Sequence, residues 1–340
     1  MRVRGFLPIA AAAILIPALA VGAQDLNGAG SSFAAPLYSR WSADYVAKTG
    51  VKVNYLSVGS GAGIKQFQEM TVDFGGTDAP MTDAELAAAK GGAVLHVPTG
   101  MGAVVLTYNV PGVTNELKVT PAVIAGIFLG TITKWNDARI ETLNPGSKLP
   151  STDIVVVHRS DASGTTFIWT SYLTAVSPDW AKQVGAGKDV KWPVGLGGAQ
   201  NAGVAGQVRQ IPGAVGYVEL AFARQNKLGY ATVENKAGKF VEATIEGVSE
   251  AAASVAKGLP ANTDFRISIL NAPGNEAYPI SSMTWALVYE KQSDPVKGKK
   301  LVDFLRYGLT EGQKSGEKLD YAPLPEAIVK QLLKRLDSVK

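Results

Sequence analysis

The chain has 340 residues, a formal net charge of +4, two histidines and no cysteine. The near balance of charge, without any basic block, argues against nucleic acid as a partner. The lack of cysteine excludes disulfides and a cysteine-linked lipid, and with so few histidines we expect no metal and no cofactor. A chain of this length is expected to form two domains.

The first 23 residues have the pattern of a secretory signal peptide. Arg2 and Arg4 form a basic start, residues 9–21 form an apolar run, and small residues lead up to Ala23. The run is too short for a convincing membrane span, although an N-terminal anchor is the alternative. We therefore expect a periplasmic protein that is secreted through the inner membrane and cleaved near Ala23. Cleavage would lower the formal charge to +2.

Beyond the signal peptide, helix and strand patterns alternate along the chain. In order, the patterns predict a helix capped by Ser31 or Ser32 and ended by Gly50, strand 51–55, helix 64–70, strand 72–74, a helix with the capping box Thr82 and Glu85, strands 93–97 and 104–108, a helix opened by Thr120 and ended by Gly130, strand 154–158, helix 167–173, helix 201–210, strand 214–218, helix 246–257, strands 265–270 and 284–289, and helices 294–307 and 324–339. This order is typical of an α/β protein with largely parallel sheets.

Three loops rich in glycine and hydroxyl residues precede predicted helices, at residues 28–33, 59–63 and 160–165. The first amides of a helix have no internal partner and carry the positive end of its dipole, so they suit an anion. Arg159, before the third loop, adds a guanidinium that fits a tetrahedral oxyanion. One such loop is more often only a turn, but three of one kind indicate an anion site.

Motifs along the mature chain resemble those of the periplasmic phosphate-binding proteins of bacterial ABC phosphate-uptake (Pst) systems. The more specific motifs are residues 72–80, which include Asp78, and residues 159–165, which begin at Arg159. Further matching segments are residues 28–36, 53–55, 213–219, 278–280 and 319–322.

The resemblance implies a two-domain periplasmic binding fold of type II, each domain a mostly parallel sheet flanked by helices. Residues 24–105 and 285–340 would form domain I and residues 106–284 domain II, with two hinge crossovers and the ligand cleft between them. The implied partners are inorganic phosphate and an inner-membrane ABC permease and ATPase complex, and we expect a monomer.

The resemblance also implies which residues hold phosphate. By motif position they are Ser32, Phe33, Ser60 and Asp78 from domain I, and Arg159, Ser163, Gly164 and Thr165 from domain II. Asp161 would pair with Arg159 and hold its guanidinium in place. The family often has threonine at the position of Ser32, and it often has a second serine where this chain has Gly61, so one hydroxyl donor is absent there.

Asp78 bears on the choice of anion. A carboxylate facing an oxyanion in a closed cleft repels it unless the ligand brings a proton to donate. Phosphate carries such a proton at neutral pH and sulfate does not, so the site should bind phosphate and exclude sulfate. The alternative is that Asp78 is an ordinary turn residue before Pro80.

The sequence fits other functions less well than phosphate binding. Residues 158–161 combine His, Ser and Asp, but His158 and Arg159 should point to opposite faces of a strand, and His96 lies in an apolar run. No nucleophile elbow, P-loop or dinucleotide fingerprint occurs, so we expect a binding protein rather than an enzyme such as a phosphatase. A binding protein for another oxyanion, such as sulfate or molybdate, and a surface adhesin or signalling module are the remaining alternatives.

Overall fold

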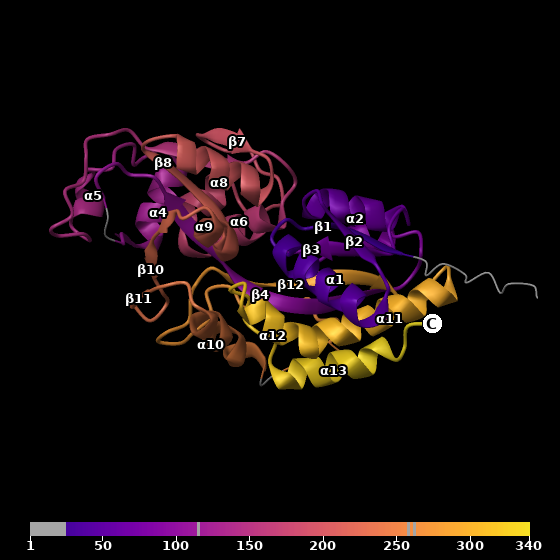
Figure 1. The fold of residues 1–340 in the computed structure, drawn as a ribbon. Coiled ribbons are helices and arrows are strands. Elements are labelled where there is room, and N and C mark those ends of the chain that lie inside the picture. The colour runs from indigo at the N-terminus through magenta and orange to yellow at the C-terminus, as the bar shows by residue number, and fades with distance from the viewer. Residues whose placement is uncertain (1–24, 114–115, 257–258, 261–262) are drawn as a thin grey trace, which may run out of the picture.

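The computed structural model describes residues 25–113, 116–256, 259–260 and 263–340, and the predicted signal peptide lies outside these residues. The described part of the chain forms two lobes that share a nine-stranded sheet, with the order β2-β1-β3-β12-β4-β8-β6-β7 and β9 beside β4 (Figure 1). Within these ranges, no helix combines the length and the apolar character needed to cross a bilayer.

The first lobe contains the beginning and the end of the chain. Its strands are β1 (Leu26–Gly30), β2 (Val53–Ser57), β3 (Phe74–Thr77) and β12 (Ser281–Tyr289), and its helices are α1 (Ala35–Thr49), α2 (Ser60–Gln68), α3 (Asp83–Ala87), α11 (Pro295–Leu309), α12 (Glu311–Glu317) and α13 (Glu326–Leu336). β1 pairs in parallel with β2 and β3, whereas β12 runs antiparallel to β3. The predicted parallel arrangement therefore holds for the three strands that lead into the N-terminal loops.

The core of the first lobe joins the two ends of the chain. Trp41 of α1 packs edge-on against Phe304 of α11, with ring centroids 6.2 Å apart, and its indole N–H donates to the carbonyl of Gly312 at 2.8 Å. On the opposite face, Phe67 of α2 stacks on Tyr289 of β12 at 4.2 Å. Helices thus cover both faces of the sheet, and the indigo and yellow segments lie together in Figure 1.

The second lobe is built from the middle of the chain. Its strands are β6 (Val155–Arg159), β7 (Leu196–Gly198), β8 (Ala214–Glu219) and β9 (Gly229–Tyr230), and its helices are α4 (Pro121–Phe128), α5 (Ala138–Glu141), α6 (Gly164–Val176), α7 (Pro178–Gln183), α8 (Gln200–Gln210) and α9 (Leu220–Gln225). β6 pairs in parallel with β7 and β8. Trp169 of α6 stacks on Tyr217 of β8 at 5.1 Å, which fixes α6 against the sheet.

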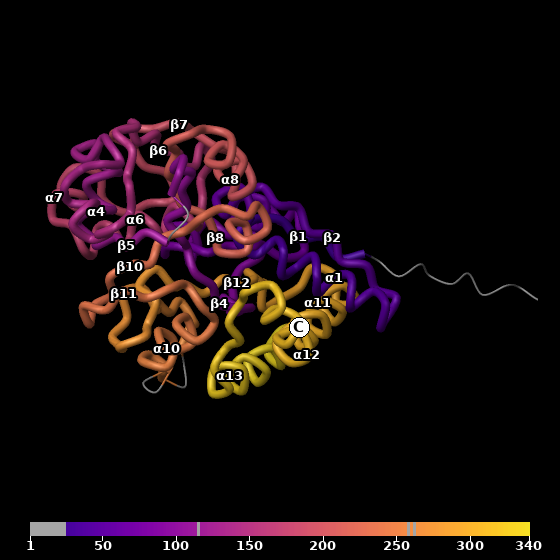
Figure 2. Tube along the Cα trace, turned by 60° about the vertical axis from the view of Figure 1, so that its left-hand side comes forward, coloured from indigo at the N-terminus to yellow at the C-terminus, as the bar shows by residue number. Residues whose placement is uncertain are grey.

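A smaller sheet extends this middle segment. β5 (Lys118–Val119), β10 (Thr232–Glu234) and β11 (Phe240–Val241) form its three strands, and α10 (Ile245–Ala256) follows them. In both views β10, β11 and α10 lie below the second lobe, toward the C-terminal helices (Figure 2).

A single long strand, β4 (Val94–Tyr108), connects the lobes. It pairs antiparallel with β12 up to Ala103 and with β8 from Val104 onward. The sequence predicted two strands, at 93–97 and 104–108, and the structure joins them into one. The sheet is therefore continuous through the junction of the lobes.

Two local predictions were wrong. Residues 265–270 form no strand: Phe265 has φ of +59°, which is not an extended conformation, and both edges of β12 are already taken by β3 and β4. The first helix begins at Ala35 with Ala34 as N-cap, and neither Ser31 nor Ser32 caps it. The capping box of Thr82 and Glu85 and the cap at Thr120 are as predicted.

Candidate anion-binding site

Asp78 lies directly after β3, at the end of the strand that faces the second lobe, and is only 1% exposed. The hydroxyl of Ser31 lies 2.6 and 2.7 Å from its two carboxylate oxygens, and the hydroxyl of Thr284 donates to Oδ1 at 2.7 Å. Ser60 lies 3.4 Å from Oδ2, the oxygen with the fewest close donors. Oδ2 can therefore accept one more hydrogen bond.

Burial raises the pKa of Asp78 to about 6, against the opposing effect of the hydrogen bonds from Ser31 and Thr284 and of the Arg159 charge. At neutral pH the side chain is therefore mostly a carboxylate, an acceptor without a proton. Sequence reasoning had not found Ser31 and Thr284 as its partners, because Thr284 is 206 residues away along the chain.

Arg159 ends β6 and is 3% exposed. Its Nε donates to one oxygen of Asp161 at 2.8 Å and its Nη2 to the other at 2.5 Å. The predicted pair of Arg159 and Asp161 is therefore present, and it is bidentate. Burial would raise the pKa of Asp161, but the hydrogen bonds and charge of Arg159 outweigh it and hold that pKa below its usual range. The guanidinium is thus fixed in place by an ionised carboxylate, with further N–H groups free to turn elsewhere.

The N-terminus of α6 follows Arg159 by a short turn. Ser163 is the N-cap, and its Oγ accepts the backbone N–H of Thr166 at 3.1 Å. The amides of Gly164 and Thr165 are the first of the helix and have no partner inside it. This end of a 13-residue helix therefore presents two amides and the positive end of its dipole.

The hydroxyl groups of Ser32 and Thr165 already accept hydrogen bonds from nitrogen donors. Asn201 donates from its backbone at 3.3 Å and from Nδ2 at 2.9 Å to the Oγ of Ser32. The same Nδ2 lies 3.1 Å from the Oγ1 of Thr165, which also lies 3.4 Å from Nη1 of Arg159. Because their lone pairs are occupied, both hydroxyls have their own hydrogens left to donate, as Ser163 does. Sequence reasoning missed Asn201, which it treated only as the start of a helix.

The candidate residues of the first lobe and those of the second form two half-sites, and these touch one another. A Cβ on Gly164 would lie 2.5 Å from the Oγ of Ser60 and 2.6 Å from Oδ2 of Asp78, so only glycine fits at this approach. Gly61 donates its amide to the carbonyl of Ala162 at 2.9 Å. Its amide is therefore used between the lobes and is not available to an anion.

Phe33 differs from the other candidate residues. Its ring is fully buried, packs edge-on against Tyr321 at 6.1 Å, and lies in the core of the first lobe. Its carbonyl accepts the Tyr321 hydroxyl at 2.5 Å. Any contact of Phe33 with an anion must therefore come from its backbone N–H.

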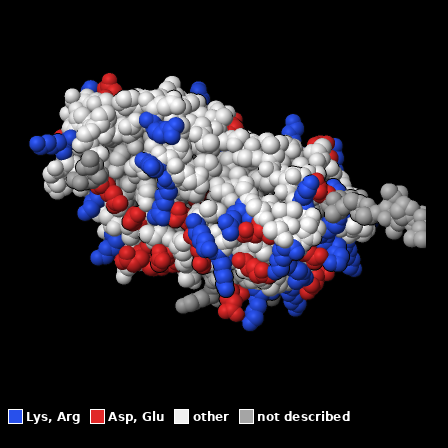
Figure 3. Space-filling view, viewed as in Figure 1, with Lys and Arg blue, Asp and Glu red and all other residues white. Residues whose placement is uncertain are grey.

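The charged side chains of the site do not sum to a positive charge. Arg159 is offset by Asp161, and Asp78 adds a further negative charge. Outside the site, Figure 3 shows that charged side chains gather over the lower helices, while the face over the upper lobe is mostly uncharged. An anion would therefore be held by hydroxyls, amides and helix ends rather than by net charge.

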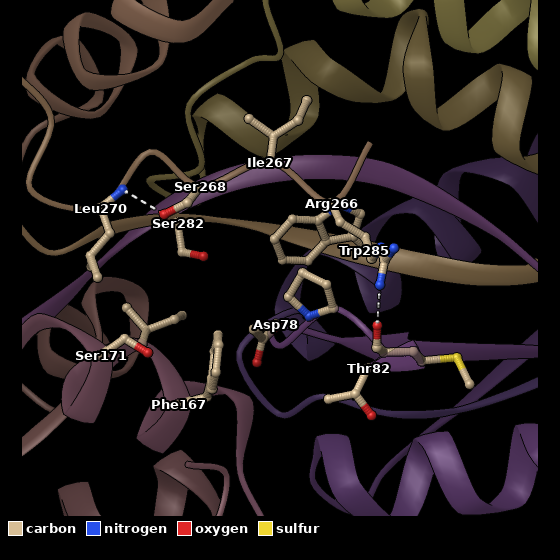
Figure 4. A pocket seen from close by; sticks show the side chains of 13 residues that line it. Asp78, Thr82, Phe167, Ser171, Arg266, Ile267, Ser268, Leu270, Ser282 and Trp285 are labelled. Carbon is tan, nitrogen blue, oxygen red and sulfur yellow. Dashed lines mark hydrogen bonds between the residues drawn. The ribbon is translucent and has the colours of Figure 1, made fainter. Parts of the chain in front are cut away.

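Beside Asp78, a cavity of about 350 Å³ lies between the lobes. Figure 4 shows Phe167 and Ser171 of α6 on one side of it and Ile267 and Trp285 on the other. Its lining is mainly apolar and includes Asp78, but not Arg159 or residues 163–166 at the start of α6. The cavity is thus adjacent to the converging donors but separate from them.

Neither histidine belongs to the site. His158 stacks on Trp192 at 4.8 Å, and the ring of His96 accepts the N–H of Met81 at 3.0 Å. Burial lowers the pKa of His96 to about 4, so its ring is neutral at neutral pH. In the described ranges no three His, Cys, Asp or Glu side chains are placed to hold a metal ion.

Comparison with known proteins places the chain among binding proteins. The family described as "PBP superfamily domain" matches residues 17–311. The "Phosphate-binding protein PstS" of Xylella fastidiosa (strain 9a5c) is 46% identical over 308 residues, covering 90% of this chain and 83% of the relative. The protein of the same name from Pasteurella multocida is 42% identical over 316 residues, covering 93% and 90%. The solved structure "Phosphate-Binding Protein from Stenotrophomonas maltophilia" has a TM-score of 0.73 at 21% identity, covering 92% of this chain and 93% of the other, and so has the same fold.

Proposed function

Because the chain belongs to the PBP superfamily and, within it, to the PstS phosphate-binding proteins, we propose that it captures inorganic phosphate in the periplasm and delivers it to an ABC transporter permease. The relatives are named as binding proteins, in line with the expectation of a role without catalysis. The permease and its ATPase, and a monomeric state, are part of the proposal.

One observation carries the choice of ligand. The hydroxyls of Ser32, Ser163 and Thr165 all accept hydrogen bonds from N–H groups, so each is left to donate to an oxyanion. Ser60, the amides of Phe33, Gly164 and Thr165, and the remaining N–H groups of Arg159 would complete the donor set. These are the residues that we propose to bind phosphate, together with Asp78.

Asp78 is the single acceptor in this set. Its Oδ2 lies toward Gly164, at the meeting of the two half-sites. A phosphate oxygen that carries a proton would donate to Oδ2, whereas sulfate has no proton and would place an unprotonated oxygen against a carboxylate. We infer that this contact excludes sulfate and equally disfavours other fully deprotonated oxyanions.

Phosphate would favour closure of the lobes, since only the closed state places both half-sites on one anion. We propose residues 24–105 and 285–340 as domain I and residues 106–284 as domain II, with the ligand cleft between them. Residues 1–23 would serve as the signal peptide.

The test is titration calorimetry with phosphate, sulfate and arsenate on protein that has been unfolded and refolded, which removes any ligand that co-purifies. We expect strong heat with phosphate and none with sulfate at pH 8. A protein that binds sulfate as well as phosphate, or that binds neither, would contradict the proposal. Release of phosphate from esters in proportion to added protein would instead support a phosphatase.

A further inference from the structure

The start of α8 has an unusual backbone conformation. Gln200 has φ of +59°, in the left-handed region that costs energy for a residue with a side chain. Such strain persists where surrounding contacts hold it, and it often marks a functional position. The contacts of Gln200 show what holds it here.

Gln200 spans the cleft with its side chain. Its Nε2 donates to the backbone carbonyl of Ser57 at 2.9 Å, and the Ser57 hydroxyl donates to its Oε1 at 2.8 Å. Ser57 ends β2 in the first lobe, whereas α8 belongs to the second (Figure 1). The backbone N–H of Gln200 donates to Oδ1 of Asp161 at 3.0 Å, the carboxylate that holds Arg159.

Asn201 also spans the cleft and is fully buried. Its backbone N–H and Nδ2 reach Ser32 in the first lobe, while Nδ2 also reaches Thr165 in the second. Its Oδ1 accepts the backbone N–H of Glu219 at 3.0 Å, which fixes the amide with its NH₂ toward the two hydroxyls. The same group therefore joins the lobes and leaves both hydroxyls free to donate to an anion.

We propose that Gln200 and Asn201 form an interlobe clasp that stabilises the closed state and positions Ser32, Thr165 and Arg159 for the anion. The clasp rests on the proposed phosphate-binding function and adds residues that do not themselves need to touch phosphate. Its hydrogen bonds to the first lobe exist only when the lobes meet. They therefore make closure more favourable and slow the release of ligand.

The variant Gln200→Asn separates the clasp from general stability. Asparagine tolerates the left-handed region better than glutamine does, so the melting temperature should not fall. Its side chain is one methylene shorter and cannot make both contacts with Ser57. The matched control is Gln207→Asn on the same helix, because among the described residues the side chain of Gln207 donates to Gly197 within the second lobe and to nothing in the first.

The readouts are the phosphate Kd by calorimetry, the release rate by stopped flow, and the interlobe distance. The chain has no cysteine, so spin labels on Lys52→Cys and Asp179→Cys, both exposed, report one distance. For Gln200→Asn we expect Kd to rise about 5- to 30-fold through faster release, with fewer closed molecules at subsaturating phosphate. Gln207→Asn should match the parent in all three readouts.

A second variant tests the other half of the clasp. Asn201→Ala should also speed phosphate release, and Asn201→Ala combined with Gln200→Asn should release phosphate faster than either variant alone. Unchanged release and an unchanged distance distribution in Gln200→Asn would overturn the clasp, as would an equal effect of Gln207→Asn. If the parent protein binds no phosphate, the proposed function is wrong. The clasp is still tested by comparing the interlobe distance of the parent and of Gln200→Asn without ligand.

Discussion

Lowering the pH should open the site to sulfate, because Asp78 is a buried carboxyl whose pKa is raised to about 6. Above that pKa the group is a carboxylate that only accepts. Below it the group is a carboxylic acid that donates, and the clash with a fully deprotonated oxyanion becomes a hydrogen bond.

The size of the effect follows from the fraction of neutral Asp78. With a pKa of about 6, roughly 1% of Asp78 is protonated at pH 8 and roughly 90% at pH 5. If sulfate binds only the protonated form, its affinity should increase by about two orders of magnitude over this range. Most of this rise should fall between pH 8 and pH 6, because the neutral fraction reaches roughly half at pH 6 and changes less than about twofold below it. Phosphate affinity should change much less, since phosphate can donate to the carboxylate or accept from the acid.

The assay uses titration calorimetry to measure how well sulfate displaces phosphate at pH 5, 6, 7 and 8, in buffers without oxyanions. Asp78→Asn is the control, because its amide does not titrate and can donate at every pH. That variant should bind sulfate at pH 8 and show no rise on acidification, so a pH effect from any other group would appear in it. A folded parent protein whose sulfate affinity is the same at pH 5 and pH 8 would refute the role assigned to Asp78.

Three further variants test the site and the core. Arg159→Ala should weaken phosphate binding by about 3–5 kcal/mol in calorimetry, because the anion loses a buried guanidinium and half-buried Asp161 loses its partner. The surface variant Arg139→Ala should leave the affinity unchanged, and a small loss for Arg159→Ala would remove Arg159 from the site. Gly164→Ala should abolish tight phosphate binding while the lobes stay folded, because the added methyl group would lie 2.5 Å from the Oγ of Ser60 and 2.6 Å from Oδ2 of Asp78. An affinity equal to that of the parent would show that the half-sites do not approach this closely. Trp41→Ala should lower the free energy of unfolding by about 3–5 kcal/mol in urea denaturation, and a loss below 1 kcal/mol would contradict the packing between the chain ends.

Much of the candidate site could be inferred from residues that lie close together in the sequence. Arg159 and Asp161 lie two residues apart at a strand end, and the hydroxyl-rich turn before α6 lies within the next few residues. Residue types alone therefore made this loop a candidate for an anion, and the other two loops and the family resemblance were needed to favour that interpretation. The strand β6 and the start of α6 lie within a few residues of their predicted positions. Asp78 needed the family resemblance, since an aspartate in a turn before proline is common.

The rest depends on contacts between segments that are distant in sequence. No local pattern tells that Thr284 and Ser31 donate to Asp78, or that Asn201 reaches Ser32 across 169 residues. Residues 265–270 have a strand-like alternation, but a strand needs a free neighbouring edge, and periodicity does not report whether one exists. The donor direction of a hydroxyl, likewise, follows from its neighbours in space.

The contact between Trp41 and Gly312 has a consequence for the order of folding. The second lobe is assembled mainly from the uninterrupted middle of the chain, so its parallel strands and helices are all present once residue 230 is available. The first lobe lacks β12 and α11–α13 until the last segment arrives, and the indole of Trp41 stays unpartnered until then. Pairings this far apart are slow to form, so we expect the middle lobe to fold first and the final helices to complete the molecule.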